Sequence, residues 1–379
     1  MNINEESLKK HEEWKGKLEI KSKAQVNNSH DLAVAYTPGV AQPCIEIHKD
    51  RENVYKYTMK GNTVAVVTDG SAVLGLGNIG PEAALPVMEG KCVLFKEFGD
   101  VNAIPVCLDT QDTEEIIKTV KIIAPAFGGI NLEDISAPRC FEIEERLKKE
   151  LNIPVFHDDQ HGTAIVVLAA LINALKLTGK NKENIKLVIN GSGSAGIAIT
   201  KLLKFYGVEN IILCDRNGIL TKDDKNKNEA QNKIAKEINP ENITGDLSEA
   251  MKNADVFIGV SGPDAVNTEM VKSMNMKSII FAMANPMPEI MPDKAKEAGA
   301  YIVGTGRSDF PNQINNVLVF PGIFRGAIKA RIQITEEIKI RAAKAIASMV
   351  DVNQLNPENI LPKAFQQGIA ERVAREIMR

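Results

Sequence analysis

The sequence predicts a two-domain α/β protein in which an N-terminal α/β domain precedes a doubly wound parallel sheet, with C-terminal helices packing back on the first domain. At 379 residues the chain exceeds the size at which a single hydrophobic core stops growing. From Thr63 onward, short β-branched runs alternate with helical segments, which is the pattern of buried parallel strands. A strand at 185–190 runs directly into a glycine-rich turn and an apolar helix.

The composition is that of an ordinary soluble protein, with 44% hydrophobic and 25% charged residues. A net charge of −3 favours neither nucleic acid nor a membrane surface as a partner. The charged segment 1–20 lacks the apolar core of a signal peptide, and no apolar run approaches the roughly 18 residues of a membrane span. The five cysteines are scattered without a C-x-x-C pair, which favours reduced thiols. We therefore expect a cytoplasmic protein whose partners are small molecules and other copies of itself.

The first part of the chain offers two isolated candidates for proton transfer. Tyr36 stands just before the turn signal Pro38-Gly39, although a single Tyr is more often a packed aromatic than a catalytic acid. Lys91 enters an apolar segment, where a lysine is either a surface residue with a buried stem or a desolvated base. The polar helices expected in 1–31 are too polar to stand alone, so we expect them on the main body or on a second subunit.

Two pairs of neighbouring acids each follow an apolar run. Glu133 and Asp134 form one pair, and Asp158 and Asp159 form the other, after a short strand at 153–156 and before a helix expected over 164–177. Like charges this close destabilise a fold unless a cation or a shifted pKa relieves them. Oxygen ligands without a Cys or His cluster favour Mg²⁺ or Mn²⁺ over zinc. Solvated loop acids are the alternative.

A dinucleotide site is predicted where the strand at 185–190 meets its turn. In such a turn one glycine permits the bend, the second lets a pyrophosphate approach the backbone, and the third packs helix against strand. The residues of the turn are Gly191, Ser192, Gly193, Ser194, Ala195 and Gly196. Asp215 ends the next strand and favours NAD, whereas Arg216 could hold the 2′-phosphate of NADP. The similar run Gly75-x-Gly77-x-x-Gly80 follows a loop instead of a strand, so we interpret it as a substrate loop.

Later strands are expected at 256–260, 278–283 and 301–303, and helices at 322–349 and 360–378. Asn285 follows the second of these strands, at the sheet edge where parallel sheets bind ligands. We place a substrate and metal domain at 1–160, a Rossmann-type NAD(P) domain at 161–305, and a mostly helical segment at 306–379 that returns to the first domain.

Together these residues resemble the malic enzyme family in its short prokaryotic form. The resemblance rests on several separated motifs over nearly the whole chain: Tyr36-Thr-Pro-Gly-Val40, 68–80, Lys91, Glu133-Asp134, His157-Asp-Asp-Gln-His-Gly-Thr163, the Gly191 turn, Phe281-Ala-Met-Ala-Asn-Pro286 and Asn315-Asn316. It implies oxidative decarboxylation of L-malate to pyruvate and CO₂ with reduction of NAD or NADP, and a homodimer.

The resemblance also implies a role for each site residue. Glu133, Asp134 and Asp159 would bind Mn²⁺ or Mg²⁺. Lys91, with Asp158 as its proton-handling partner, would take the proton of the C2 hydroxyl, and Tyr36 would protonate C3. Asn285 and Asn316, with Asn315, would orient the substrate carboxylates and the nicotinamide amide.

Larger members of the family carry an arginine where this chain has Ser71-Ala72-Val73, which leaves the binding of the C4 carboxylate open. Two rival functions also remain. A malolactic enzyme would retain the reduced cofactor and release lactate, and a dinucleotide-sensing regulator would bind NAD without turnover.

Overall fold

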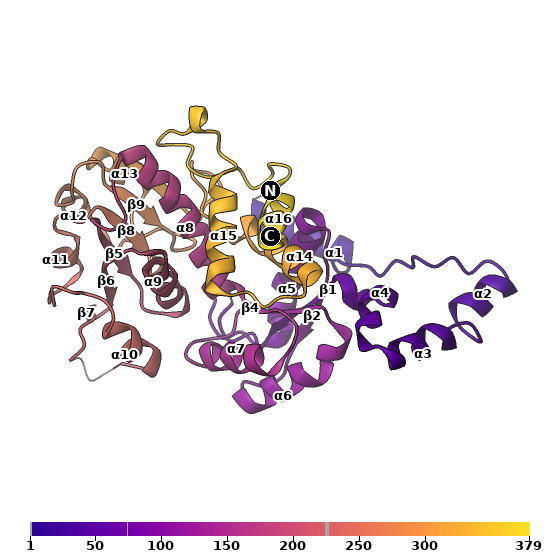
Figure 1. Ribbon diagram of the computed structural model, residues 1–379. Coiled ribbons are helices and arrows are strands. Elements are labelled where there is room, and N and C mark those ends of the chain that lie inside the picture. The colour runs from indigo at the N-terminus through magenta and orange to yellow at the C-terminus, as the bar shows by residue number, and fades with distance from the viewer. Residues whose placement is uncertain (1, 74, 224–226) are drawn as a thin grey trace.

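The computed structural model describes residues 2–73, 75–223 and 227–379 (Figure 1). Its first sheet is wholly parallel, with strand order β2-β1-β3-β4. The strands are β1 (Thr63–Thr68), β2 (Asn102–Cys107), β3 (Gly129–Leu132) and β4 (Val155–His157). The helices that follow them are α5 (Pro81–Gly99), α6 (Thr113–Ile123), the 3₁₀ turn η3 (Ala124–Ala126) and α7 (Arg139–Glu150).

Alternate residues of β1 supply the two faces of this sheet. Val64 and Val66 pack in the core that contains Phe95 of α5, whereas Ala65 and Val67 pack in the core that contains α6 and α7. Both faces are covered, which explains why the strand reads as a continuous apolar run.

The second sheet has the order β10-β9-β8-β5-β6-β7 and is parallel except for the short β7 at its edge. Its strands are β5 (Lys186–Asn190), β6 (Asn210–Asp215), β7 (Gly218–Ile219), β8 (Val256–Gly259), β9 (Ile279–Ala282) and β10 (Ile302–Thr305). Its helices are α9 (Ser194–Tyr206), α10 (Glu229–Ala235), α11 (Leu247–Met251), α12 (Thr268–Lys272) and α13 (Pro292–Glu297). The predicted α/β class and doubly wound sheet are confirmed.

Helix α8 (Asp158–Thr178) joins the two sheets and packs against α9. It is long and apolar enough to cross a membrane by length and composition, contrary to the expectation that no segment of the chain comes near that length. In the fold, however, 72% of its apolar window is buried inside the protein, as expected for the core helix of a large domain.

The C-terminal segment returns to the first domain. It contains η4 (Asn316–Leu318), α14 (Phe320–Ala330), α15 (Glu336–Ala347), η5 (Val352–Gln354) and α16 (Ile369–Ile377). The Phe320 and Phe324 rings of α14 lie 4.7 and 5.4 Å from that of Phe95 in α5, and α15 packs along α8. The helix expected over 322–349 is broken because Arg331 is left-handed, with φ 55°. The one expected over 360–378 begins only after Gly368, at φ 86°.

The N-terminal segment contains α1 (Ile3–Trp14), α2 (Ser29–Ala35), α3 (Ala41–Lys49), η1 (Arg51–Asn53), α4 (Val54–Tyr57) and η2 (Met59–Asn62). None of the residues 2–59 is buried. Residues 20–50, here called the N-terminal arm, carry α2 and α3 away from the rest of the chain (Figure 1).

Candidate functional site

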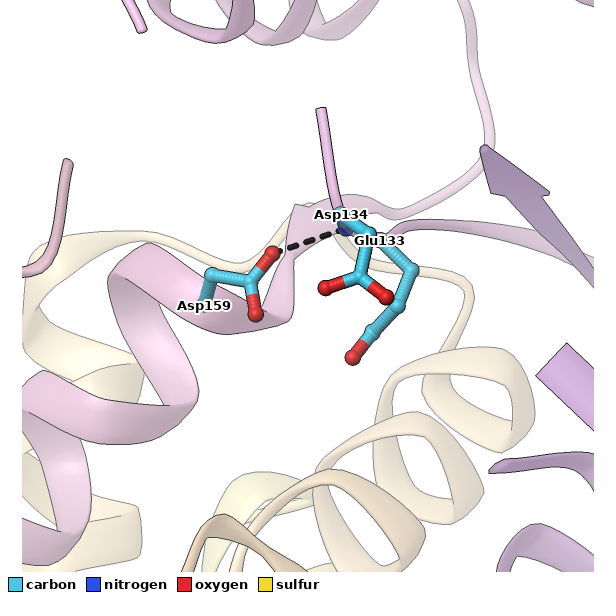
Figure 2. Close-up of side chains that lie close together, drawn as sticks. All are labelled: Glu133, Asp134 and Asp159. Carbon is cyan, nitrogen blue, oxygen red and sulfur yellow. Dashed lines mark hydrogen bonds between the residues drawn. The ribbon is translucent and has the colours of Figure 1, made fainter. Parts of the chain in front are cut away.

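Three carboxylates from two segments converge beside the first sheet. Glu133 and Asp134 directly follow β3, and Asp159 lies in the first turn of α8, after β4. Strands β3 and β4 pair in register, with Leu132 opposite His157, so their carboxyl ends bring the acids together. Ligand oxygens of the three groups lie within 4.8 Å of one another (Figure 2). The Asp134 backbone N–H donates to Asp159 Oδ2 at 2.9 Å, which fixes the two segments relative to each other.

Helix α8 begins at Asp158, six residues earlier than the sequence predicts. Asp158 and Asp159 therefore belong to the first helical turn instead of a loop. The positive end of the helix dipole favours carboxylates there. Gly162 permits the arrangement, because a Cβ at that position would lie 1.9 Å from Asp158 Oδ1.

Lys91 lies inside α5 and is held by two of these acids. Its Nζ is 2.6 Å from Asp158 Oδ2 and 2.8 Å from Glu133 Oε1, and it lies over the Phe320 ring. The Asn316 amide also donates to Asp158 Oδ2. Burial alone would lower the pKa of Lys91, but Asp158 and Glu133 outweigh it and raise this pKa above its ordinary value. The Lys91 side chain is therefore an ammonium.

This acidic cluster is suited to a hard divalent cation. Lys91 pairs with two of the four carboxyl groups. Burial, with Asp159, Asp158 and Asp134, raises the pKa of Glu133 although Lys91 opposes the rise. A cation among Glu133, Asp134 and Asp159 would relieve that repulsion, and a donor set of carboxylate oxygens alone matches Mg²⁺ or Mn²⁺.

Sequence reasoning missed two residues that support the site, one at each sheet. The Asn131 amide donates to Glu133 Oε2 at 2.8 Å. The fully buried Glu289 carboxylate accepts the backbone N–H groups of Ser261 and Ala284, at 2.8 and 3.1 Å, and so ties together the segments after β8 and β9. The side chains of Asn131 and Glu289 are recognisable only from their positions in the fold, since neither lies in a motif.

The glycine turn between β5 and α9 has the geometry of a dinucleotide site. A Cβ at Gly191 would lie 2.4 Å from the Val260 carbonyl oxygen, and one at Gly196 would lie 1.7 Å from the Gly191 carbonyl oxygen. A Cβ at Gly193 would meet no described protein atom within 4 Å, which leaves that side open for a ligand. Ser194 begins α9, whose N-terminal amides face the same space.

Asp215 ends β6 beside this turn, because Asn190 and Cys214 are register partners. Its Oδ1 accepts the Asn217 backbone N–H at 2.7 Å, and Arg216 next to it is exposed. Both side chains lie at the strand end where an adenine ribose would bind, so the choice between NAD and NADP stays open.

A cleft of about 640 Å³ connects the acidic cluster with the glycine turn. Its lining includes Asp134, Asp159, Gly193, Ser194, Ala195, Asn285, Asn315 and Asn316, and also Gly75 of the predicted substrate loop. The structure therefore brings together most of the predicted site. Asn315 has a structural task as well, since its Oδ1 accepts the Val317 N–H at 2.9 Å and caps η4.

No arginine appears among the described lining residues. Ser71 instead accepts from Arg139, which also pairs with Asp69 at 2.7 Å.

Tyr36 is the predicted site residue that the chain does not bring to the cleft. It directly follows α2 on the N-terminal arm and is 67% exposed. Helix α2 lies away from α5 and α8 in Figure 1. Among the described residues, the Tyr36 hydroxyl has no hydrogen-bond partner. Within a single chain Tyr36 therefore does not reach Lys91, and its assignment as the group that protonates C3 stays a prediction.

Comparison with known proteins places these features in a family. The model of the malic enzyme N-terminal domain matches residues 15–148, and that of the malic enzyme NAD binding domain matches residues 160–379. The bifunctional malic/malolactic enzyme of Bacillus subtilis is 59% identical over 379 residues, which cover 100% of this chain and 92% of that protein. The NAD-dependent malic enzyme of Geobacillus stearothermophilus is 58% identical over 364 residues, covering 96% and 76%. The crystal structure of the NAD-dependent malic enzyme of Thermotoga maritima matches with a TM-score of 0.95 at 50% identity, over 98% of both chains.

The fold and site thus define a two-domain α/β enzyme in which an acidic cleft faces a dinucleotide-binding sheet. The chain belongs to the malic enzyme family. The predicted resemblance and enzyme class are confirmed.

Proposed function

We propose that the protein oxidises L-malate and decarboxylates the product to pyruvate and CO₂, reducing NAD⁺ or NADP⁺, with Mn²⁺ or Mg²⁺ held by Glu133, Asp134 and Asp159. The observation that carries this proposal is the single cleft that joins a three-carboxylate cluster to an open glycine turn. When bound, the cation supplies a Lewis acid that draws electrons from the substrate as CO₂ leaves. The cleft volume lies within the range of small-molecule sites.

Lys91 and Asp158 handle the proton of the C2 hydroxyl in this proposal. Lys91 is an ammonium, so it first passes a proton to Asp158, 2.6 Å away, whose own pKa is raised by burial despite Lys91. Glu133, the second carboxylate in contact with the ammonium, would attract it less strongly while also holding the cation. The neutral amine then accepts the hydroxyl proton while the C2 hydride passes to the nicotinamide. Asn285 and Asn316, with Asn315, orient the carboxylates and the nicotinamide amide.

In this proposal a second copy of the chain supplies Tyr36 to the cleft. The N-terminal arm exposes seven large hydrophobic side chains: Ile20, Val26, Leu32, Val34, Tyr36, Val40 and Ile45. Helices of seven and nine residues are not stable alone in water, so the arm requires a partner surface. We propose a homodimer in which Tyr36 of the partner subunit enters the cleft and protonates C3.

The five free cysteines support a cytoplasmic location, where thiols stay reduced.

The direct test of the proposed reaction follows absorbance at 340 nm with L-malate, Mn²⁺ and either NAD⁺ or NADP⁺, with and without chelator. NAD(P)H formation that a chelator stops, accompanied by pyruvate, is the expected result. The preferred dinucleotide decides between the roles of Asp215 and Arg216. Dinucleotide binding without malate turnover would contradict the proposal and favour the regulator.

The malolactic reaction is the second candidate, because the Bacillus subtilis relative at 59% identity is named a bifunctional malic/malolactic enzyme. The same cleft serves both reactions if the reduced cofactor stays bound and returns its hydride to pyruvate. Lactate appearing in place of pyruvate, without net NADH, identifies that outcome.

A further inference from the structure

Three polar side chains from three helices, two of them buried and one partly buried, meet beside the first turn of α8. Glu144 comes from α7, His161 from α8 and Lys339 from α15. His161 Nε2 lies 2.7 Å from Glu144 Oε2, and His161 Nδ1 lies 2.9 Å from Lys339 Nζ. Lys339 is only 1% exposed and also contacts Glu336 at 2.6 Å. We call these three residues the Glu144–His161–Lys339 network.

The chemistry of the groups determines which atoms donate. Burial alone would raise the pKa of Glu144, but His161 and Lys148 hold it well below its ordinary value, so this group is a carboxylate and can only accept. His161 Nδ1 faces Lys339 Nζ, and because an ammonium group only donates, this ring nitrogen accepts. His161 Nε2–H therefore donates to Glu144, and Nδ1 accepts from Lys339. Every contact in the network has a donor and an acceptor.

The network contacts the first turn of α8 at two points, one before and one after the site acids Asp158 and Asp159. The second oxygen of Glu144, Oε1, accepts the His157 backbone N–H at 3.1 Å, immediately before Asp158. His161 follows Asp158 by three positions in the same helix, within one helical turn. Asp158 and Asp159 thus lie between two points that Glu144 holds by hydrogen bonds. Lys339, from the C-terminal segment, holds the His161 ring from its other nitrogen.

We propose that the Glu144–His161–Lys339 network positions Asp159 for cation binding and Asp158 beside Lys91, so that α15 controls the metal affinity of a site to which it supplies no ligand. The inference rests on the metal site of the proposed function. Stability alone does not explain the network, because buried ionisable groups incur a desolvation cost that apolar side chains of similar size avoid. Partners of metal-holding groups set ligand orientation in metalloproteins, and their loss typically weakens metal binding about 10- to 100-fold.

The test measures the dissociation constant of Mn²⁺ from the substrate-free full-length protein, by electron paramagnetic resonance of the free ion. Lys339→Met keeps the length of the side chain but removes its donor to His161, and we expect Mn²⁺ binding at least about 10-fold weaker. Hydrogen exchange of amides 157–163 in the metal-free variant should also become faster. Both readouts are independent of turnover.

Lys180→Met is the matched control. Lys180 lies just beyond the other end of α8 and forms a partly buried pair with Asp255 at 2.5 Å. Its loss should lower stability while leaving Mn²⁺ affinity unchanged.

His161→Ala and His161→Gln provide a second comparison, which carries the test if Lys339→Met does not fold. Glutamine retains a donor and an acceptor, so it should recover part of the Mn²⁺ affinity that alanine loses. A folded Lys339→Met, or failing that a folded His161→Ala, that binds Mn²⁺ within about twofold of the wild type overturns the inference and leaves the proposed function intact. A wild-type protein that binds no Mn²⁺ overturns the metal site itself.

Discussion

Lys91 is the residue whose loss should separate the two halves of the proposed reaction. Lys91→Ala should reduce malate oxidation by about 10²- to 10⁴-fold, the usual contribution of a positioned acid or base. Decarboxylation of added oxaloacetate should partly survive, because it depends on the carboxylate cluster. Stopped assays of NAD(P)H and pyruvate measure both activities.

Lys96→Ala is the control for that substitution, since Lys96 lies on the same helix with its side chain 52% exposed and pairs with the exposed Asp100. It should retain wild-type rates. Equal loss of oxidation in both variants, or unchanged oxidation in Lys91→Ala, would contradict the assignment of Lys91 as the base.

His161 should make the protein less stable in mild acid. Its pKa of about 3 in the fold lies below the ordinary 6.5, so below pH 6.5 the unfolded chain binds a proton that the folded chain does not. The free energy of unfolding should therefore fall as pH falls from about 6.5, by up to about 1.4 kcal/mol per pH unit from this group. Urea titrations with chelator present, at pH 7 and pH 5, should show a smaller pH effect in His161→Gln. An equal effect would refute the burial of a neutral His161.

The residues of the site differ in how far their type and spacing reveal them. Glu133, Asp134, Asp158 and Asp159 could be predicted because each pair follows a strand, and the carboxyl ends of parallel strands meet at one edge. Lys339 could not, since Glu336-Glu337-Ile-Lys339 looks like the solvated face of a helix. Its burial depends on the packing of α15 against α8, a tertiary contact that no local pattern encodes.

At the scale of elements, two glycines of the turn can be compared: one borders the open space where a ligand would bind, and the other packs against protein atoms. Gly193→Ala places its methyl group where no described protein atom lies within 4 Å, so stability should hold while dinucleotide affinity falls. Gly196→Ala forces a methyl group to 1.7 Å from the Gly191 carbonyl oxygen and should lose both, with at least about 1–3 kcal/mol of stability. Fluorescence titration with NADH and urea unfolding measure the two quantities. Undiminished NADH affinity in Gly193→Ala would contradict binding at this turn.

The strands were predicted better than the helix ends, for a physical reason. Buried parallel strands such as β1 and β5 are short, continuous apolar runs bounded by turn residues. Helix α8 begins at two adjacent acids, which suit the helix dipole but also look like a loop. The helix break at Arg331 could not be predicted, because the residue that takes the left-handed conformation there is an arginine and not a glycine.

At the scale of the whole molecule, the position of Tyr36 predicts complementation between two inactive variants. Co-expressed Tyr36→Phe and Lys91→Ala chains should form hybrid dimers with one intact site, because an intact Tyr36 and an intact Lys91 then meet across the interface. Random pairing would restore about a quarter of wild-type activity. Pairing wild type with the Tyr36→Phe/Lys91→Ala double variant is the mirror control, since its hybrids contain no intact site. Activity in those hybrids but not in the first set would place Tyr36 and Lys91 in the same subunit.

The return of the C-terminal segment to the first domain was predicted from its apolar helices, and the packing of α14 on α5 agrees with it. The exposed N-terminal arm could not be placed from sequence, because its partner surface lies outside its own chain in the proposed dimer. The boundaries at residues 160 and 305 stay predictions.

The most direct measurement is the molar ratio of CO₂ released from L-malate to NAD(P)H formed, in one reaction with Mn²⁺ and again with chelator. The account predicts a ratio of about one with Mn²⁺ and neither product with chelator, because oxidation and decarboxylation share one cleft. CO₂ without NAD(P)H would contradict the oxidative reaction, and undiminished formation of both products with chelator would contradict the metal site.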